Sequence, residues 1–98
     1  MSARERRTAA LIAGVPAAGA YVYLLRCRDG SLYCGWTNDL ERRVAAHAAG
    51  RAAKYTRGRG PVELVWSRAM PDASAARREE ARVKRLPRAA KLALVTGR

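Results

Sequence analysis

Ninety-eight residues provide for one modest hydrophobic core, which excludes a multidomain architecture and requires any active site to be assembled from a few short elements. Twenty Lys and Arg residues against eight Asp and Glu residues give a formal net charge of +12, so nucleic acid is the expected partner ahead of a membrane surface. No apolar run approaches the length of a membrane span. The two cysteines, Cys27 and Cys34, match no metal-ligand spacing and are interpreted as free thiols in a reducing cytoplasm.

Residues 1–19 are interpreted as a flexible basic N-terminal tail ahead of a single domain at residues 20–95. The stretch from Arg4 to Ala20 has the basic start, weak apolar run and small residues of a secretion signal, but Gly14 and Pro16 interrupt the apolar run. Cleavage near Ala20 would also leave the first predicted strand at the end of the chain. We therefore favour the tail over the signal.

Two aromatic and apolar runs predict a β-hairpin at the start of the domain. Residues Tyr21–Cys27 and Leu32–Trp36 are predicted as strands, and the stretch Arg28-Asp29-Gly30-Ser31 between them is typical of a turn. Each strand carries a tyrosine triplet, Tyr21-Val22-Tyr23 in the first and Tyr33-Cys34-Gly35 in the second.

Helical and strand signals then alternate along the chain. Asn38 as N-cap, Glu41 three residues later and Gly50 as a stop predict a helix over Asn38–Ala49. A loop over residues 50–61 and a third strand over Val62–Trp66 follow. A long helix that starts at Asp72 or Ser74 and ends at Leu86 comes next, and a short closing helix covers Arg88–Val95. The predicted fold class is α+β, a sandwich-like arrangement of a small three-stranded antiparallel sheet flanked by helices, in the order β-β-α-β-α-α.

Charged residues occupy the core-facing stripes of both long helices. Arg43 and His47 fall at the helical spacing that Leu40 and Val44 define. Glu79 lies among apolar residues at the same spacing in the later helix, where an unpaired carboxylate would be costly. A structural ion pair between Arg43 and Glu79 is the simplest explanation, with a metal ion or another cation as the alternative. For His47 the simplest explanation is a half-exposed surface position.

The order and spacing of these residues resemble the GIY-YIG nuclease superfamily. Tyr21-Val22-Tyr23 stands for the first triplet and Tyr33-Cys34-Gly35 for the second, and Arg43, His47 and Glu79 follow in the same order. The resemblance covers roughly Ala20 to Val95. It is strongest to small stand-alone bacterial members, which share the stretches Asp29-Gly30-Ser31-Leu32-Tyr33, Thr37-Asn38-Asp39-Leu40-Glu41-Arg42-Arg43 and Lys54-Tyr55-Thr56-Arg57-Gly58.

This resemblance implies a metal-dependent endonuclease that hydrolyses DNA phosphodiester bonds, is structure-selective and is linked to DNA repair or recombination. The tyrosines matching Tyr23 and Tyr33 would line the site, and one would take or relay a proton from water, with His47 lowering the cost of that step. Arg43 would pair with phosphate oxygens as charge develops. Glu79 would hold one divalent cation, Mg²⁺ or Mn²⁺.

Four positions depart from the family pattern. Tyr21 stands in place of the first glycine, Cys34 in place of an aliphatic residue, and Trp36 where repair-type members often have lysine. Many members also have an asparagine after the glutamate helix, where this chain offers Lys91. The alternative function is therefore a nucleic-acid-binding module on the same scaffold, with weak or no cleavage.

A basic segment after the first helix predicts a surface that contacts nucleic acid, because no acidic residue occurs from Arg42 through Pro61. The residues expected to make these contacts are Arg42, Arg51, Lys54, Tyr55, Arg57 and Arg59. The other aromatic residues, Tyr21, Trp36 and Trp66, are interpreted as packing residues because strands favour them. DNA is the expected partner of a monomer, with RNA and an unknown protein partner left open. Recognition of DNA shape or ends is expected in place of a long base sequence.

A shared active site constrains the hairpin connection. A symmetric two-residue turn at Asp29-Gly30 would place Tyr23 and Tyr33 on opposite faces of the sheet. A three-residue loop ending at Gly30, with that glycine in the left-handed conformation, would put both tyrosines on one face. We therefore expect an odd-length or bulged connection, and one cleft that joins both tyrosine hydroxyls to the helical candidates Arg43, His47 and Glu79.

Overall fold

The computed structural model describes residues 18–52 and 60–97. Six elements follow one another in these ranges: β1 (Ala20–Arg26), β2 (Leu32–Thr37), α2 (Leu40–Ala48), β3 (Glu63–Met70), α3 (Ala73–Lys84) and α4 (Arg88–Thr96). The strands form one antiparallel sheet in the order β2-β1-β3, which confirms the predicted fold class and element order. The tail predicted for residues 1–19 lies outside the described residues, except for its last two positions.

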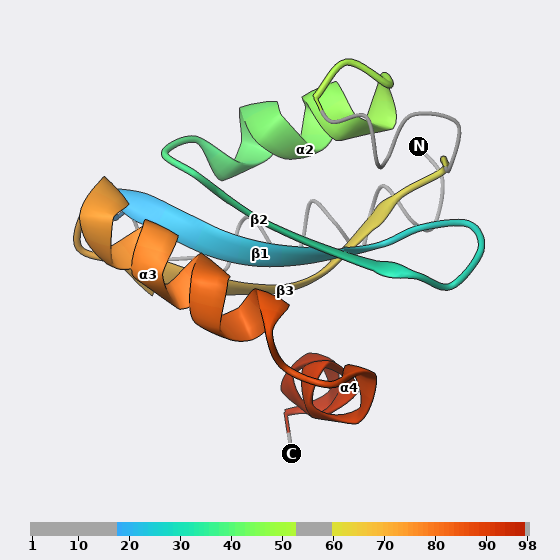
Figure 1. Ribbon diagram of the computed structural model, residues 1–98. Helices are drawn as coiled ribbons and strands as arrows, with labels where there is room; N and C mark the ends of the chain where they lie inside the picture. Colours follow the sequence, from blue (N-terminus) through green and yellow to red (C-terminus); the bar gives the residue numbers. More distant parts are fainter. Residues whose placement is uncertain (1–17, 53–59, 98) are drawn as a thin grey trace.

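The sheet separates two apolar clusters because side chains alternate between its faces along each strand. Tyr23 and Leu25 of β1 pack with Leu40 and Val44 of α2, whereas Val22 and Leu24 pack on the opposite side. Figure 1 shows α2 over one face and both α3 and α4 over the other. Strand β1 is apolar on both faces because it lies in the middle of the sheet.

The hairpin has the three-residue connection that a shared site requires. Gly30 has φ +84°, and the Cys27 amide donates to the Ser31 carbonyl at 2.9 Å, which closes the loop over residues 28–30. Tyr23 therefore pairs with Gly35, and Leu25 pairs with Tyr33. The prediction that both tyrosines lie on one face is confirmed.

Two boundaries change a cap or lengthen a strand relative to the sequence prediction, and the other boundaries lie within two residues of it. The N-cap of α2 is Asp39, whose Oδ1 accepts from the Arg42 amide at 3.1 Å, and the predicted cap Asn38 lies one residue before it. Strand β3 continues four residues beyond Trp66, because it pairs with β1 as far as Met70 opposite Ala20. A register shift in the β1–β3 pairing lets the longer strand follow the twist of the sheet.

The remaining ends follow the predicted signals. Asp72 caps α3 by accepting from the Ala75 amide at 2.8 Å, and α4 begins directly after Pro87. Cys27 and Cys34 are buried and unbridged, in the two different apolar clusters. Within the described parts of the chain, no helix is long and apolar enough to cross a membrane.

Candidate active site

Tyr23 lies in the middle of β1, and its phenol crosses over β2 at the position of Gly35. Its side chain is 1% exposed, and a Cβ added to Gly35 would lie 2.5 Å from the Tyr23 hydroxyl oxygen and 2.7 Å from Cζ. Any larger residue at this cross-strand position would collide with the phenol. Gly35 is therefore required by the close approach of the Tyr23 ring to the backbone of β2.

His47 of α2 meets the Tyr23 phenol inside the protein. The Tyr23 hydroxyl oxygen and His47 Nε2 are 2.8 Å apart in a buried hydrogen bond. His47 is only 2% exposed because it continues the buried stripe of Leu40 and Val44 along α2. The half-exposed position that seemed simplest from the sequence is therefore wrong for His47.

Burial keeps both members of this pair uncharged. Burial and, after it, the charge of Arg43 lower the pKa of His47 to about 4, so the imidazole is neutral near pH 7. Burial, with the neighbouring Tyr33 as a further cause, raises the pKa of Tyr23 well above its ordinary value. When Nε2 carries no proton, the phenol donates to it, and the pair then consists of a neutral donor and a neutral acceptor.

Tyr33 lies beside this pair and is more exposed than Tyr23. Its ring centroid is 6.4 Å from that of Tyr23 and 5.0 Å from that of His47. Burial raises the pKa of the Tyr33 phenol and the charge of Glu80 adds to the rise, whereas Lys84 and Arg43 act against it. Tyr33 is thus the phenol at the opening of the site, close to charges of both signs.

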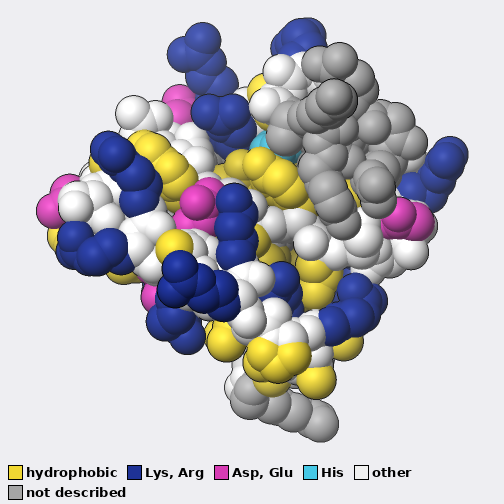
Figure 2. Space-filling model, viewed as in Figure 1, with side chains coloured by type: hydrophobic (Ala, Val, Ile, Leu, Met, Phe, Trp, Pro, Cys, Tyr) yellow, Lys and Arg dark blue, Asp and Glu magenta, His cyan; other side chains and the backbone are white. Residues whose placement is uncertain are grey.

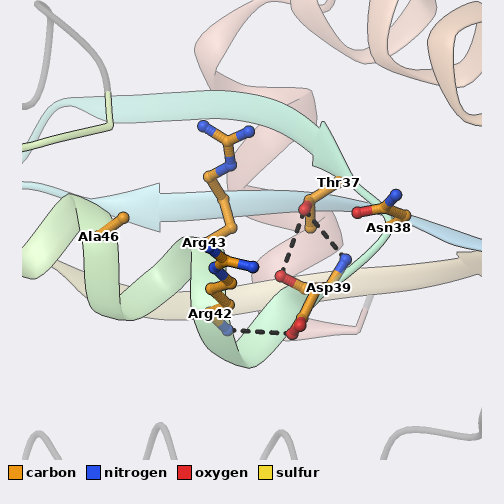
Figure 3. A pocket seen from close by; sticks show the side chains of 6 residues that line it. All are labelled: Thr37, Asn38, Asp39, Arg42, Arg43 and Ala46. Atoms are coloured by element: carbon orange, nitrogen blue, oxygen red, sulfur yellow. Dashed lines mark hydrogen bonds between the residues drawn. The ribbon is translucent and has the colours of Figure 1, made fainter.

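Arg43 lines an open cavity at the start of α2. The cavity has a volume of about 390 Å³ and is lined by Thr37, Asn38, Asp39, Arg42, Arg43 and Ala46. In Figure 3 the Arg43 side chain extends from α2 toward β2. It is exposed, which corrects the expectation that it lies in the core-facing stripe. Its charge still acts on the pKa of Tyr23, Tyr33 and His47.

Glu79 is held by arginines on the β3 side of α3. Its carboxylate accepts from Arg82 Nε at 2.6 Å and forms a second ion pair with Arg68 of β3. The hydrogen bond from Arg82 is the largest cause of the lowered pKa of Glu79. The Glu79 carboxylate therefore has positively charged partners, as expected, but these partners are Arg68 and Arg82 and not Arg43.

The neighbouring Glu80 faces the β2 side of the same helix. Its backbone oxygen is 3.9 Å from Cys34 Sγ, and its carboxylate is 3.7 Å from Lys84 Nζ. Its charge contributes to the raised pKa of Tyr23, Tyr33 and Cys34. The sequence did not predict a role for Glu80, although its spacing from Ala76 and Val83 also fits the inner side of the helix.

The structure therefore brings together Tyr23, Tyr33 and His47 on the α2 face of the sheet, with Arg43 exposed on the same helix as His47. Glu79 and Glu80 belong to α3 on the other face (Figure 1), and the cavity that Arg43 lines includes neither tyrosine among its lining residues. Of the residues predicted to contact nucleic acid, Arg42 and Arg51 are exposed. The others, Lys54, Tyr55, Arg57 and Arg59, lie outside the described residues. Trp36 and Trp66 pack at the border of the cluster under α3, as predicted, and also lie next to Arg77 and Arg68.

Comparison with known proteins agrees with this arrangement. A family model described as the GIY-YIG catalytic domain matches residues 19–93. The chain belongs to the GIY-YIG family. GIY-YIG domains are nuclease domains, and the triplets and Arg43 of this member lie within the matched range.

Small proteins named UPF0213 are similar to this GIY-YIG chain over most of their length. UPF0213 protein OB0043 of Oceanobacillus iheyensis is 55% identical over 75 residues, which are 76% of this chain and 87% of that protein. UPF0213 protein XAC3202 of Xanthomonas axonopodis pv. citri is 55% identical over 73 residues, 74% of this chain and 72% of that protein. The solution NMR structure of UPF0213 protein BH0048 from Bacillus halodurans is 52% identical with a TM-score of 0.51, and the match covers 79% of this chain and 82% of that one. The resemblance to the small stand-alone members is confirmed, and the shared name states no activity.

Proposed function

We propose that this GIY-YIG protein is a divalent-metal-dependent endonuclease that hydrolyses DNA phosphodiester bonds. The observation that carries the proposal is the buried hydrogen bond between Tyr23 and His47, with Tyr33 beside it. Arg43, which lines the cavity at the start of α2, acts on all three residues through its charge. Phosphodiester hydrolysis needs a proton acceptor for the attacking water and stabilisation of the charge on the phosphoryl oxygens. These four residues supply candidates for both.

Tyr23 and His47 act together in accepting the proton. The attacking water gives a proton to the Tyr23 hydroxyl oxygen, while the phenol proton passes across the 2.8 Å hydrogen bond to His47 Nε2. Tyr23 is never required to become a phenolate, which its raised pKa would oppose. The lowered pKa of His47 keeps Nε2 available as an acceptor at neutral pH. Tyr33, the more exposed phenol, contacts the phosphate or the water from the open side.

Arg43 binds the non-bridging phosphate oxygens. Its guanidinium is exposed at the cavity, and a fixed planar fork suits two oxygens of one phosphate. The same charge lowers the pKa of Tyr23, which favours release of the phenol proton, and it also lowers the pKa of His47, which disfavours the imidazolium that accepts it. Arg43 therefore acts on both the phosphate and the proton acceptor.

For the carboxylate of the site we favour Glu80 over the predicted Glu79. Glu79 already accepts from two arginines, so a cation there would have to displace them. Glu80 has one lysine at 3.7 Å and acts electrostatically on both tyrosines. Among the described residues no three His, Cys, Asp or Glu side chains gather into a metal site. One carboxylate still fits Mg²⁺ or Mn²⁺, which in phosphoryl sites takes its remaining ligands from water and substrate phosphate.

When bound, the cation would neutralise charge on the phosphoryl group and its leaving oxygen. The Glu80 carboxylate would hold it in place of the ion pair with Lys84. Structure-selective action on DNA with ends or branches, linked to repair or recombination, is the finer part of the proposal. It is supported by a site built from phosphate-directed groups, because such contacts position the backbone without reading bases.

A nucleic-acid-binding module with weak or no cleavage is the second candidate. The ion pair between Lys84 and Glu80 favours it, because a lysine that already neutralises the carboxylate competes with a divalent cation. Lys91, at the place where many family members have asparagine, points the same way. Nicking assays separate the two candidates.

The test compares nicking of supercoiled and branched DNA with Mg²⁺ or Mn²⁺ by the parent protein, Glu80→Gln and Glu79→Gln. We expect Glu80→Gln to lower the rate by about 100-fold or more, the size of effect that one electrostatic group has in such sites. Glu79→Gln should cut at nearly the parental rate and unfold more easily, because it loses charged hydrogen bonds from Arg68 and Arg82. The reverse pattern would return the metal-binding role to Glu79. If all three proteins bind DNA equally and none cuts it, the binding module is correct.

A further inference from the structure

Apart from Glu80, the charged groups on the α3 side of β2 have no role in the chemistry described above. Lys84 lies near the end of α3, while Arg88 and Lys91 lie in the first turns of α4. From residue 77 to residue 91 there are seven Lys and Arg residues and two acidic ones. Figure 2 shows that Lys and Arg side chains outnumber the acidic ones over this side of the molecule.

Three contacts place Lys84 and Arg88 along the hairpin that carries Tyr33. Arg88 Nη2 donates to the Gly30 carbonyl at 3.0 Å, so the start of α4 is tied to the hairpin tip. Lys84 Nζ lies 3.7 Å from Glu80, whose backbone is in contact with Cys34 of β2. These cations therefore line the hairpin from its tip to the site.

The charge of this group reaches the strand next to the site. Lys84 acts against the raised pKa of Tyr33, and both Lys84 and Lys91 act against the raised pKa of Cys34. Other cations of α3 are directed elsewhere: Arg78 donates to Ser74 and Arg82 to Glu79. Arg77 lies over the Trp36 ring, near the other end of β2. Lys84 and Arg88 are thus cations of α3 and α4 on the Tyr33 side of β2, and Lys91 lies one turn after Arg88 on the same side of α4.

We propose that Lys84, Arg88 and Lys91, which we name the hairpin strip, bind the phosphate backbone of the nucleic acid on the side of β2 opposite the Arg43 cavity. The inference rests on the proposed function and adds to it the path of the substrate. The strand that carries the scissile phosphate crosses the edge of β2, with Arg42 and Arg43 on the α2 side and the hairpin strip on the α3 side. Edge strand β2, where Tyr33 lies, is the element between the two groups.

The test is the salt dependence of binding to fluorescein-labelled single-stranded and duplex oligonucleotides in EDTA, where cleavage plays no part. Each phosphate contact contributes about 0.7 to 0.9 to the slope of log K against log salt. We expect Lys84→Gln combined with Lys91→Gln to reduce that slope by about 1.5, which corresponds to two lost contacts. The single-stranded and duplex probes show which form follows the strip.

A matched control is available on the same helix. Arg78→Gln combined with Arg82→Gln removes two positive charges, as the strip variant does. Each double variant breaks one ion pair with a glutamate, and the side chains of Arg82 and Lys84 are nearly equally exposed, at 52% and 53%. We expect this control to change the slope by less than half as much. A charge-conserving variant, Lys84→Arg with Lys91→Arg, should restore the parental slope and separates loss of charge from loss of fold.

Equal slopes for the strip variant and the control would overturn the hairpin strip. The nicking assay with Mg²⁺ is run in parallel on the same proteins. If the parent protein cuts DNA and the strip variant keeps the parental salt slope, the nuclease proposal stands and the hairpin strip is wrong. If the parent does not cut and the salt slope falls only in the strip variant, the hairpin strip stands as a binding surface and the nuclease proposal is wrong.

Discussion

The Tyr23 phenol and the His47 imidazole occupy positions that favour their uncharged forms. The pair is buried under α2, and Gly35 leaves the space that the phenol needs to reach Nε2. An uncharged donor and acceptor avoid the cost of a buried ion. At residue scale, therefore, the fold holds a neutral donor and acceptor pair, which the proposed mechanism uses as its proton acceptor.

This environment predicts a pH-dependent stability for which His47 is responsible. The pKa of His47 falls from 6.5 to about 4 on folding, so the unfolded chain binds more protons between these values. Stability from this group is therefore fully present above pH 6.5 and is lost as the pH falls toward 4. Between about pH 7 and 4.5 the parent should lose on the order of 2 kcal/mol through this group. Urea unfolding at a series of pH values measures it.

His47→Asn is the control, because it removes the titrating group and keeps a polar side chain in the buried place. Its free energy of unfolding should be lower at neutral pH and should change less with pH across the same window. Parallel curves for the parent and His47→Asn would show that His47 does not titrate with a depressed pKa. The difference between the two curves excludes carboxylates such as Glu79, since both proteins contain them.

The resemblance to the GIY-YIG family selected Tyr23, Tyr33, Arg43 and His47, and all four lie on the hairpin and on the helix that directly follows it. The sequence predicted less well how deeply each of these side chains is buried. The stripe of Leu40 and Val44 placed both Arg43 and His47 toward the core, yet His47 is buried and Arg43 is exposed. A long guanidinium at the border of a stripe extends to solvent, whereas an imidazole that meets a hydroxyl can remain inside.

At the scale of elements, the hairpin loop decides on which face each tyrosine lies. One residue more or less would move every side chain of β2 to the other face. Gly30 makes the three-residue loop possible because its φ of +84° is strained for residues with a Cβ. The loop could be predicted by parity, because two side chains that share a site restrict the connection to odd lengths.

Gly30 therefore carries a prediction about the hairpin. Nothing lies within 4 Å of a Cβ added there, so Gly30→Ala introduces backbone strain without a collision. We expect a loss of about 1 kcal/mol in the free energy of unfolding for Ala and a smaller loss for Asn, which tolerates the left-handed region better. Urea unfolding of both variants measures the difference. Equal losses for Ala and Asn would show that the loop adapts and that the left-handed conformation at Gly30 is not essential.

Helix α3 shows where the sequence was insufficient. Glu79 and Glu80 are adjacent, so a rotation of about 100° around the helix axis separates their directions. Packing of Ala75, Ala76 and Val83 against the sheet sets that rotation, which turns Glu79 toward Arg68 and Glu80 toward β2. The hydrophobic stripe contains both glutamates within its width, and only the three-dimensional packing distinguishes them.

For the molecule as a whole, the two faces of the sheet carry different groups of the proposed site. The face under α2 carries the hydrogen-bonded Tyr23 and His47 and the Arg43 cavity, and the face under α3 and α4 carries Glu80 and the proposed hairpin strip (Figure 1). The element order and the two layers of helices could be predicted from periodicity, caps and turns. The sequence could not predict which cations lie near β2, because their positions depend on how α3 and α4 pack against the hairpin.

The last prediction concerns how the whole domain discriminates among nucleic acids. Its exposed Arg42 and Arg51, the hairpin strip and a net charge of +12 favour phosphates over base edges. In EDTA, affinity should fall on the order of 100-fold between about 50 and 200 mM salt, as four neutralised phosphates would produce. Oligonucleotides of one length and structure but different sequence should differ by less than about threefold at fixed salt. Anisotropy titrations test both statements, and Arg57→Gln with Arg59→Gln should flatten the salt dependence. A strong preference for one sequence, kept at high salt, would instead show that side chains of the domain read base edges.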